Sequence, residues 1–202
     1  MGDSLGQFFI LRKTKYSESD LIIQALSTRG ERVSFIARGG QKSKKRFGGG
    51  VLEPTHLVEC IYQDSKKDNN NLHLLKEAKL IEAFANLRKD YDRLELALFA
   101  LDCVYRVSLE GDQASQVIFQ LLGHLFKSID QGADLQVLKT QFIVKFLFQQ
   151  GVLTPEIWME PFLKTSLHES AKLENLKSTH LESIKLLEKA AFNYIKTADS
   201  LG

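Results

Sequence analysis

Apolar and polar residues alternate with a period close to two up to about residue 80, a pattern that is typical of half-buried β-strands. Five short strands are expected, over residues 8–11, 21–26, 33–37, 57–62 and 72–80. Turn-forming residues separate them, and a long loop follows the third strand. Five short strands with one long loop indicate a small closed β-barrel.

Beyond residue 80 the apolar residues recur at helical spacing instead. The first two helices are expected around residues 94–105 and 118–129. In the first, one face is predicted to carry Leu94, Ala97, Leu98, Leu101 and Tyr105. The change of period marks a domain boundary.

Two further helices are predicted from their end signals. One runs from Asp134, as its N-cap, to Gln150, and Gly151 is placed to end it. The last begins after Thr179, which stands three residues before Glu182 at the spacing of a capping box. The connection 154–177 is apolar but aperiodic, and no element is assigned to it. The fold class is therefore α+β, with a five-stranded barrel domain over 1–80 and an all-helical domain over 81–202.

Composition places the chain among ordinary globular proteins. Its 202 residues are 44% hydrophobic and 26% charged, which suffices for a packed core. Two cysteines, Cys60 and Cys103, form no C-x-x-C pair, so neither a disulfide framework nor a zinc site is expected. No apolar run reaches the length of a membrane helix, and the start lacks the layout of a secretory signal. We expect a soluble, cytoplasmic protein.

The net charge of +2 hides an uneven distribution. Residues 1–80 contain 14 Lys and Arg against 9 Asp and Glu, whereas residues 81–202 contain 13 against 16. This difference suggests that the first part faces a polyanion and that the second part contacts proteins.

The densest positive charge lies in the stretch ARGGQKSKKRFGGG, whose residues 38–50 we call the basic loop. Residues 38–46 contain five cations and no carboxylate, so their charge calls for phosphates or another external anion. A solvated loop is the simpler alternative. The glycines at 48–50 allow either a close approach of the backbone to a phosphate or a sharp turn, and the sequence leaves both open.

Other candidate residues have simpler explanations. Phe47, Tyr16 and Tyr62 are placed to stack on bases, although an aromatic residue in a strand is more often part of the core. Glu18 and Asp20 share a face if their segment is extended and have the chemistry of a metal site, but this segment is also typical of a turn. The five histidines show no metal-binding spacing, and neither a phosphate-binding G-x-x-x-x-G-K-[ST] loop nor a G-x-S-x-G motif occurs. No enzymatic activity and no cofactor are expected.

Residues 16–54 resemble the N-terminal signature of RecO, the bacterial DNA repair and recombination mediator family. The matching positions are Tyr16, Glu18, Asp20, Thr28, Gly30, Ala37, Arg38, Gly39, Arg46, Phe47, Leu52 and Pro54. A looser likeness continues through residues 75–90 and 142–155. Many family members carry four zinc-binding cysteines after this last segment, and here no cysteine follows Cys103, so the resemblance implies no zinc.

The resemblance implies an OB-fold barrel followed by a helical domain. It also implies a protein that binds single- and double-stranded DNA, anneals complementary strands and works with RecR to replace single-stranded-DNA-binding protein by RecA. Apolar surfaces near Trp158 and Phe162 in the helical domain are expected to receive the acidic tail of single-stranded-DNA-binding protein.

We therefore expect a non-enzymatic DNA-binding protein. The predicted phosphate ligands are Arg38, Lys42, Lys44, Lys45 and Arg46, with Arg12, Lys13 and Lys15 extending the track. Three rival hypotheses stay open: an adaptor that binds only proteins, an RNA-binding OB-fold protein, and a metal-dependent nuclease that uses Glu18 and Asp20.

Overall fold

The computed structural model describes residues 2–65, 72–108 and 116–198. The chain divides into two compact units, one of Met1–Ala83 with Ser108–Phe119 and one of Phe84–Val107 with Gln120–Gly202. These units differ from the predicted ranges 1–80 and 81–202 mainly at residues 108–119. Whether the two predicted domains fold independently stays a prediction.

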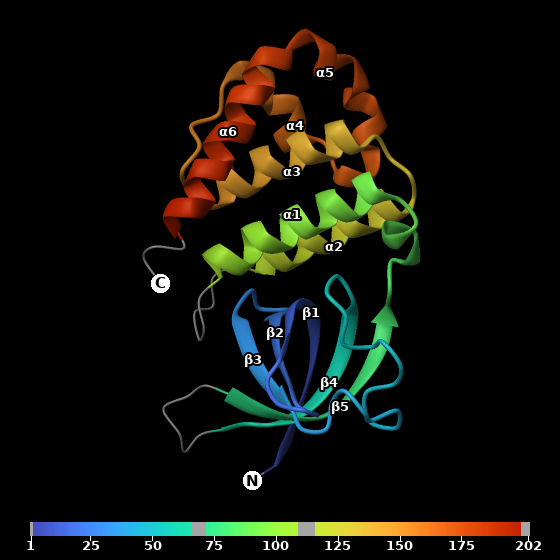
Figure 1. The fold of residues 1–202 in the computed structure, drawn as a ribbon. Coiled ribbons are helices and arrows are strands. Elements are labelled where there is room, and N and C mark those ends of the chain that lie inside the picture. The colour runs from blue at the N-terminus through green and yellow to red at the C-terminus, as the bar shows by residue number, and fades with distance from the viewer. Residues whose placement is uncertain (1, 66–71, 109–115, 199–202) are drawn as a thin grey trace. The chain divides into compact units, whose positions relative to one another are not determined.

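The first unit contains five strands, labelled in Figure 1. They are β1 (Asp3–Lys15), β2 (Leu21–Ser27), β3 (Arg32–Ala37), β4 (Leu57–Gln63) and β5 (Leu72–Glu82). All five strands expected from the alternating pattern are present, and β1 is much longer than its apolar residues indicated. The structure confirms the α+β class.

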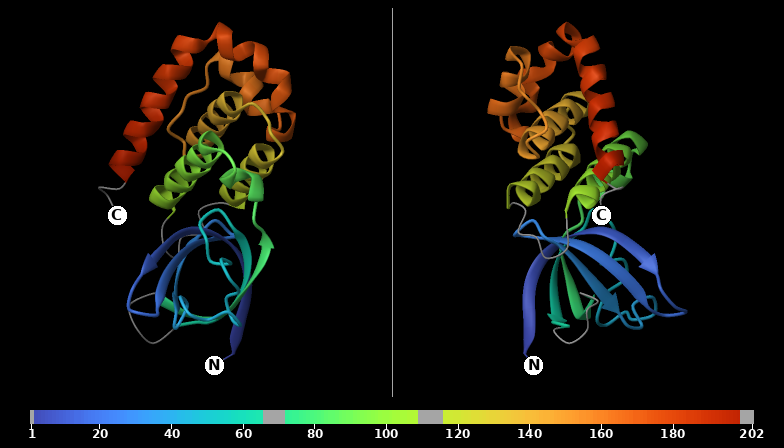
Figure 2. Two further views of the ribbon diagram at one scale, coloured as in Figure 1. Left: turned by 45° about the vertical axis from the view of Figure 1, so that its right-hand side comes forward. Right: turned by 90° about the vertical axis from the view of Figure 1, so that its left-hand side faces the viewer.

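The five strands close into a barrel in the order β1-β2-β3-β5-β4. A view along the barrel shows this ring (Figure 2, left). Neighbouring strands are antiparallel except β3 and β5, which pair in parallel at residues 34–36 and 72–74. The strand pattern predicted this closed five-stranded barrel, and the family resemblance implied that it is an OB fold.

Strand β1 closes the ring because it pairs on both sides. Its first half pairs with β4, from Asp3 opposite Gln63 to Phe9 opposite Leu57. Its second half pairs with β2, as far as Lys15 opposite Leu21, and the register shifts between Ile10 and Arg12. The inward side chains of all five strands form one core, which includes Phe8, Phe35 and Val58.

The remaining elements are helical. The longer helices are α1 (Tyr91–Val107), α2 (Gln116–Asp130), α3 (Leu135–Gln149) and α6 (Leu181–Ala198). Short helices fill the connection to which the sequence assigned no element: η2 (Ile157–Met159), α4 (Glu160–Lys164), η3 (Leu167–Leu173) and α5 (Glu174–Thr179). Another, η1 (Ala85–Arg88), precedes α1.

The predicted ends of α3 are confirmed. The Asp134 side chain accepts a hydrogen bond from the backbone N–H of Val137 at 3.0 Å, as an N-cap does. At the other end Gly151 has a φ of +70°, and its N–H donates to the carbonyl of Phe148. A side chain at residue 151 would strain this turn.

Two helix predictions are wrong in detail. Thr179 is the last residue of α5, and its hydroxyl donates to the carbonyl of Asn175 instead of capping α6. Leu98 of α1 is 45% exposed, because the buried face of that helix is centred on Ala97, Leu101 and Val104. Among the described helices, none is long and apolar enough to span a membrane.

Candidate nucleic-acid interface

The basic loop begins the connection between β3 and β4, which runs through a series of tight turns. Two apolar residues of this connection, Phe47 and Leu52, are buried in the barrel core. Gly48 and Gly50 have φ values of +37° and +80°, a conformation that favours glycine. Turn formation therefore accounts for two of the three glycines.

The start of the basic loop is tied to the residues that precede β2. The backbone N–H of Gly39 donates to the Asp20 carboxylate at 2.7 Å, and the Gln41 side-chain amide donates to the carbonyl of Ser17 at 3.0 Å. The Gly39 hydrogen bond is the main cause that holds the pKa of Asp20 below its ordinary value. The Ser17 and Ser19 hydroxyls and the charge of Arg38 lower this pKa further, and partial burial of the carboxylate opposes the shift. Asp20 thus positions the loop.

Because the Asp20 carboxylate holds the loop, it has little acceptor capacity left for the predicted metal site. The Asp20 carboxylate also accepts from the Ser19 hydroxyl, and the exposed Glu18 makes no contact that would pair it with Asp20. The described residues contain no group of three or more His, Cys, Asp or Glu side chains placed to hold a metal ion.

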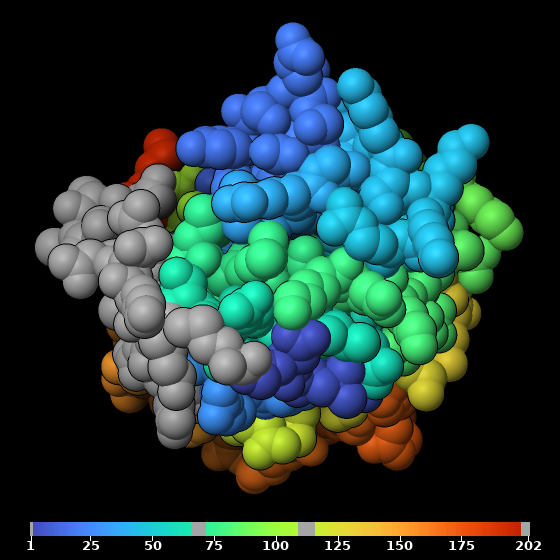
Figure 3. Space-filling view, turned by 90° about the horizontal axis from the view of Figure 1, so that it is seen from below, coloured from blue at the N-terminus to red at the C-terminus, as the bar shows by residue number. Residues whose placement is uncertain are grey.

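Four cations of the basic loop point their charge to solvent. Arg38, Lys42, Lys44 and Lys45 are exposed, and none of them forms an ion pair within the described part of the chain. Figure 3 shows this part of the loop as light-blue side chains that project from the barrel beside those of the N-terminal strands. Like charges held close together repel one another, so a bound polyanion would stabilise the loop.

Arg46 has a structural role in addition. Its guanidinium donates to the carbonyl of Arg38 at 2.5 Å and lies 5.0 Å from the centre of the Phe47 ring. Its own carbonyl accepts a hydrogen bond from the N–H of Ala78 in β5. Arg46 therefore folds the loop back on itself and fastens it to the barrel.

The three predicted cations of β1 differ from one another. Lys13 forms an ion pair with Glu53 at 2.5 Å, so its charge is already compensated. Arg12 is half-buried, and Lys15 is exposed without an ion pair among the described residues. Of this predicted extension, Lys15 is the residue most available to a phosphate.

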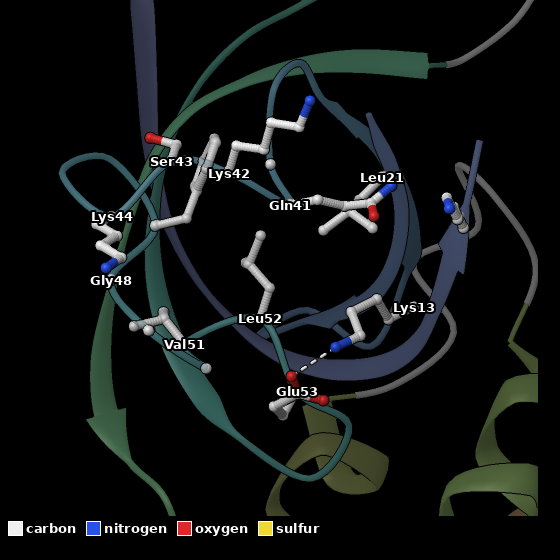
Figure 4. Close-up of a pocket in the computed structure, with 15 residues that line it drawn as sticks. Lys13, Leu21, Gln41, Lys42, Ser43, Lys44, Gly48, Val51, Leu52 and Glu53 are labelled. Carbon is white, nitrogen blue, oxygen red and sulfur yellow. Dashed lines mark hydrogen bonds and ion pairs between the residues drawn. The ribbon is translucent and has the colours of Figure 1, made fainter. Parts of the chain in front are cut away.

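The basic loop, residues 51–53, Lys13 and Lys15 of β1, and Leu21 of β2 line an open pocket of about 780 Å³ (Figure 4). Leu21, Val51 and Leu52 are among the apolar residues that line it, and Lys15 and Lys42 are among the cations. Leu52 lies between Lys42 on one side and the Lys13–Glu53 pair on the other (Figure 4). No sequence pattern indicated this pocket, because residues 13, 21, 42 and 52 come together only when the barrel closes.

The candidate stacking residues separate into core and surface. Phe47 is only 2% exposed and belongs to the barrel core, so its prediction as a stacker was wrong. Tyr62 is half-buried and packs edge-on against Phe8 and Phe35. Tyr16 is 66% exposed, which leaves it free to contact a base.

Of the two residues named for the docking surface in the second unit, Phe162 is not accessible, whereas Ile157, next to Trp158, is 89% exposed. The docking surface itself stays a prediction. Phe162 is fully buried, and Trp158 packs edge-on against it and stacks on His180. A pocket of about 480 Å³ elsewhere in this unit is lined by acidic side chains that include Asp92 and Glu95. These carboxylates would repel an acidic tail.

Comparison with known proteins identifies the family. The model of the recombination protein O N-terminal domain matches residues 1–84, which include the whole barrel and the basic loop. Proteins named DNA repair protein RecO are similar over most of the chain. The Syntrophus aciditrophicus protein is 32% identical over 143 residues, which make up 71% of this chain and 54% of that protein. This chain belongs to the RecO family.

Two other RecO proteins show the same degree of similarity. The Desulfosudis oleivorans protein is 32% identical over 147 residues, and the Desulfatibacillum aliphaticivorans protein is 32% identical over 149 residues. These matches cover 71% and 73% of this chain and 54% and 56% of the relatives. The chain thus spans about half the length of the curated RecO relatives it matches.

Proposed function

We propose that this RecO-family chain acts in recombinational DNA repair as a non-enzymatic protein that binds DNA through the phosphates of its backbone. One observation carries the proposal: Arg38, Lys42, Lys44 and Lys45 are exposed without ion pairs in the described structure, on a barrel of the RecO N-terminal family. Lys15 lines the same pocket as Lys42 and Lys44. A polyanionic strand supplies the missing counter-charge.

This mode of binding suits strand annealing. Lysine contacts to phosphates fix a strand without reading its sequence, because base edges carry the sequence information. They also screen the repulsion between two strands that approach each other. Complementary strands held in this way can be brought together while most of their bases remain free to pair.

The partners proposed for the whole protein follow from the family. The relatives are named DNA repair proteins, and this supports a role alongside RecR, single-stranded-DNA-binding protein and RecA. In this proposal the barrel contacts single- and double-stranded DNA, and the helical unit contacts proteins. Because Phe162 is buried, the docking of an acidic tail near Trp158 would use exposed apolar residues such as Ile157 in place of Phe162.

The test combines three charge reversals in the basic loop. Lys42→Glu, Lys44→Glu and Lys45→Glu together should weaken binding of a labelled single-stranded oligonucleotide by about tenfold or more at low salt, because three phosphate contacts become repulsions. Arg46 is left intact, since its hydrogen bond to Arg38 supports the loop. Fluorescence anisotropy measures the affinity.

A matched control reverses the same number of charges elsewhere. Lys79, Lys89 and Lys189 are exposed lysines outside the basic loop, and their replacement by glutamate gives the same net charge. Equal losses in both variants would show that net charge alone governs binding and would contradict the proposed site. Absence of any binding by the unaltered protein would favour the protein-only adaptor.

A further inference from the structure

The pocket between the basic loop and β1 has a composition that a phosphate site alone does not need. Leu21 and Leu52 are largely buried residues that line it, and the half-buried Val51 adds apolar surface. Exposed lysines stand at the same pocket, among them Lys15 and Lys42. Its volume of about 780 Å³ is within the range of small-molecule sites, about 300–1,000 Å³. Apolar walls beside cations suit a flat, uncharged ring attached to a phosphate.

We propose that this pocket receives one unpaired base of single-stranded DNA while Lys15, Lys42 and Lys44 contact the phosphates on either side of that base. This inference rests on the proposed DNA-binding function and adds to it a specific contact for a base. The base would lie against Leu21 and Leu52, as unpaired bases do against apolar side chains in other single-strand sites.

Glu53 favours a base over a phosphate in the interior of the pocket. Its carboxylate lines the pocket and is held by Lys13 at 2.5 Å. A phosphate placed there would be repelled by this carboxylate, whereas a neutral base would not be, and the N–H groups of a base can donate to the carboxylate. The phosphates are therefore directed to the unpaired lysines at the rim.

The glycines leave the entrance open. A Cβ atom added at Gly49 or at Gly50 would meet nothing within 4 Å, so no side chain narrows the pocket there. Gly49, unlike Gly50, has no positive φ and accepts a larger residue without backbone strain. It is the position at which the pocket can be obstructed most cleanly.

Occupation by an unpaired base would make the barrel prefer single strands. A base within a duplex has to leave its stack and its partner before it enters a pocket, and that costs free energy. Phosphate contacts by themselves give no such preference. An occupied pocket would therefore let the protein distinguish single strands from double strands, which phosphate contacts by the basic loop alone would not do.

The first arm of the test compares two strands of equal charge. A labelled oligothymidylate and an abasic strand of the same length carry the same phosphates, but the abasic strand has no bases. We expect the abasic strand to bind about fivefold more weakly or worse, the loss that corresponds to one stacked base. Anisotropy at a single salt concentration measures both affinities.

The second arm locates the contact. Gly49→Leu should bring the affinity for oligothymidylate close to that for the abasic strand, so that the ratio of the two affinities falls toward one. Gly2→Leu is the matched control, because a Cβ atom at Gly2 also meets nothing within 4 Å and Gly2 is not a pocket residue. Tyr16→Ala tests the exposed aromatic residue separately.

The outcomes separate the pocket from the proposed function. Equal affinity for the two strands would overturn the base pocket and leave phosphate binding intact. A preference for oligothymidylate that survives Gly49→Leu but disappears in Tyr16→Ala would move the base contact to Tyr16 and also overturn it. Failure to bind either strand would overturn the DNA-binding function and the pocket with it.

Discussion

The charged side chains of the basic loop have two different tasks. Asp20 and Arg46 hold the loop in place through hydrogen bonds to Gly39 and Arg38, whereas Lys42, Lys44 and Lys45 keep their charge in solvent. The division has a physical reason. A charged side chain that is already hydrogen-bonded within the chain is less available to a ligand, whereas a solvent-exposed lysine can still neutralise a phosphate.

The anchor at Asp20 predicts a titration in the acid range. Its lowered pKa means that the hydrogen bond from Gly39 stabilises the fold above the ordinary value of 3.8 and is lost as the pH falls below it. The Gly39 amide proton, followed by NMR, should titrate with a midpoint under 3.8. A midpoint at or above that value would contradict the anchoring role.

Sequence patterns identified the lysines of the site but not their surroundings. A run of cations is visible in the sequence, and their exposure follows from their charge. The ion pair between Lys13 and Glu53 joins residues 40 positions apart, so only the closed barrel reveals it. The burial of Phe47 was missed for the same reason, since a single aromatic residue in a loop carries no periodicity.

Among the secondary-structure elements, α3 shows how a helix can be buried beyond one face. Val137, Phe142, Val144 and Phe146 are all buried, although they do not lie on a single side. Its start is fixed by Asp134, which caps the helix and forms an ion pair with Lys177 of α5. The burial of Asp134 by itself raises its pKa, but Lys177 and the Val137 N–H outweigh this and hold the pKa below its ordinary value.

Replacing this cap gives a prediction for stability. Asp134→Ala should lower the free energy of unfolding by about 0.5–2 kcal/mol, because the first turn of α3 loses its acceptor. Asp134→Asn should cost less, since its side-chain oxygen can still cap while the ion pair is lost. Urea denaturation followed by circular dichroism measures both, and equal losses would show that the ion pair dominates.

Element types were predicted better than element ends. The periods of two and of 3.6 correctly separated strands from helices, because burial of one face imposes them. The short helices between Ile157 and Thr179 have few residues per buried face and left no period to detect. The capping box at Thr179 does not form because Thr179 is the last residue of α5 and its hydroxyl is bonded to the Asn175 carbonyl.

The molecule as a whole consists of two compact units, each of which contains one buried cysteine. Burial raises the pKa of the Cys60 thiol and of the Cys103 thiol to about 12, so both should resist labelling until their surroundings open. Cys60 therefore reports on the barrel and Cys103 on the helical unit.

This pair of reporters tests whether the units unfold separately. In single-cysteine variants labelled across a urea series, Asp134→Ala should shift the labelling midpoint of Cys103 to lower urea and leave that of Cys60 in place. Equal shifts at the two thiols would show one cooperative unit and contradict the predicted division into independent domains.

The salt dependence of single-strand binding tests the central claim most directly. If Arg38, Lys42, Lys44 and Lys45 each neutralise one phosphate, the logarithm of the binding constant should fall with the logarithm of salt concentration with a slope of about −3, given roughly −0.7 per phosphate. Reversal of the three charges at Lys42, Lys44 and Lys45 should make this slope shallower, with a magnitude of about 1 or below. A slope that is the same for the variant and the unaltered protein would contradict binding by the basic loop and place the DNA on another surface.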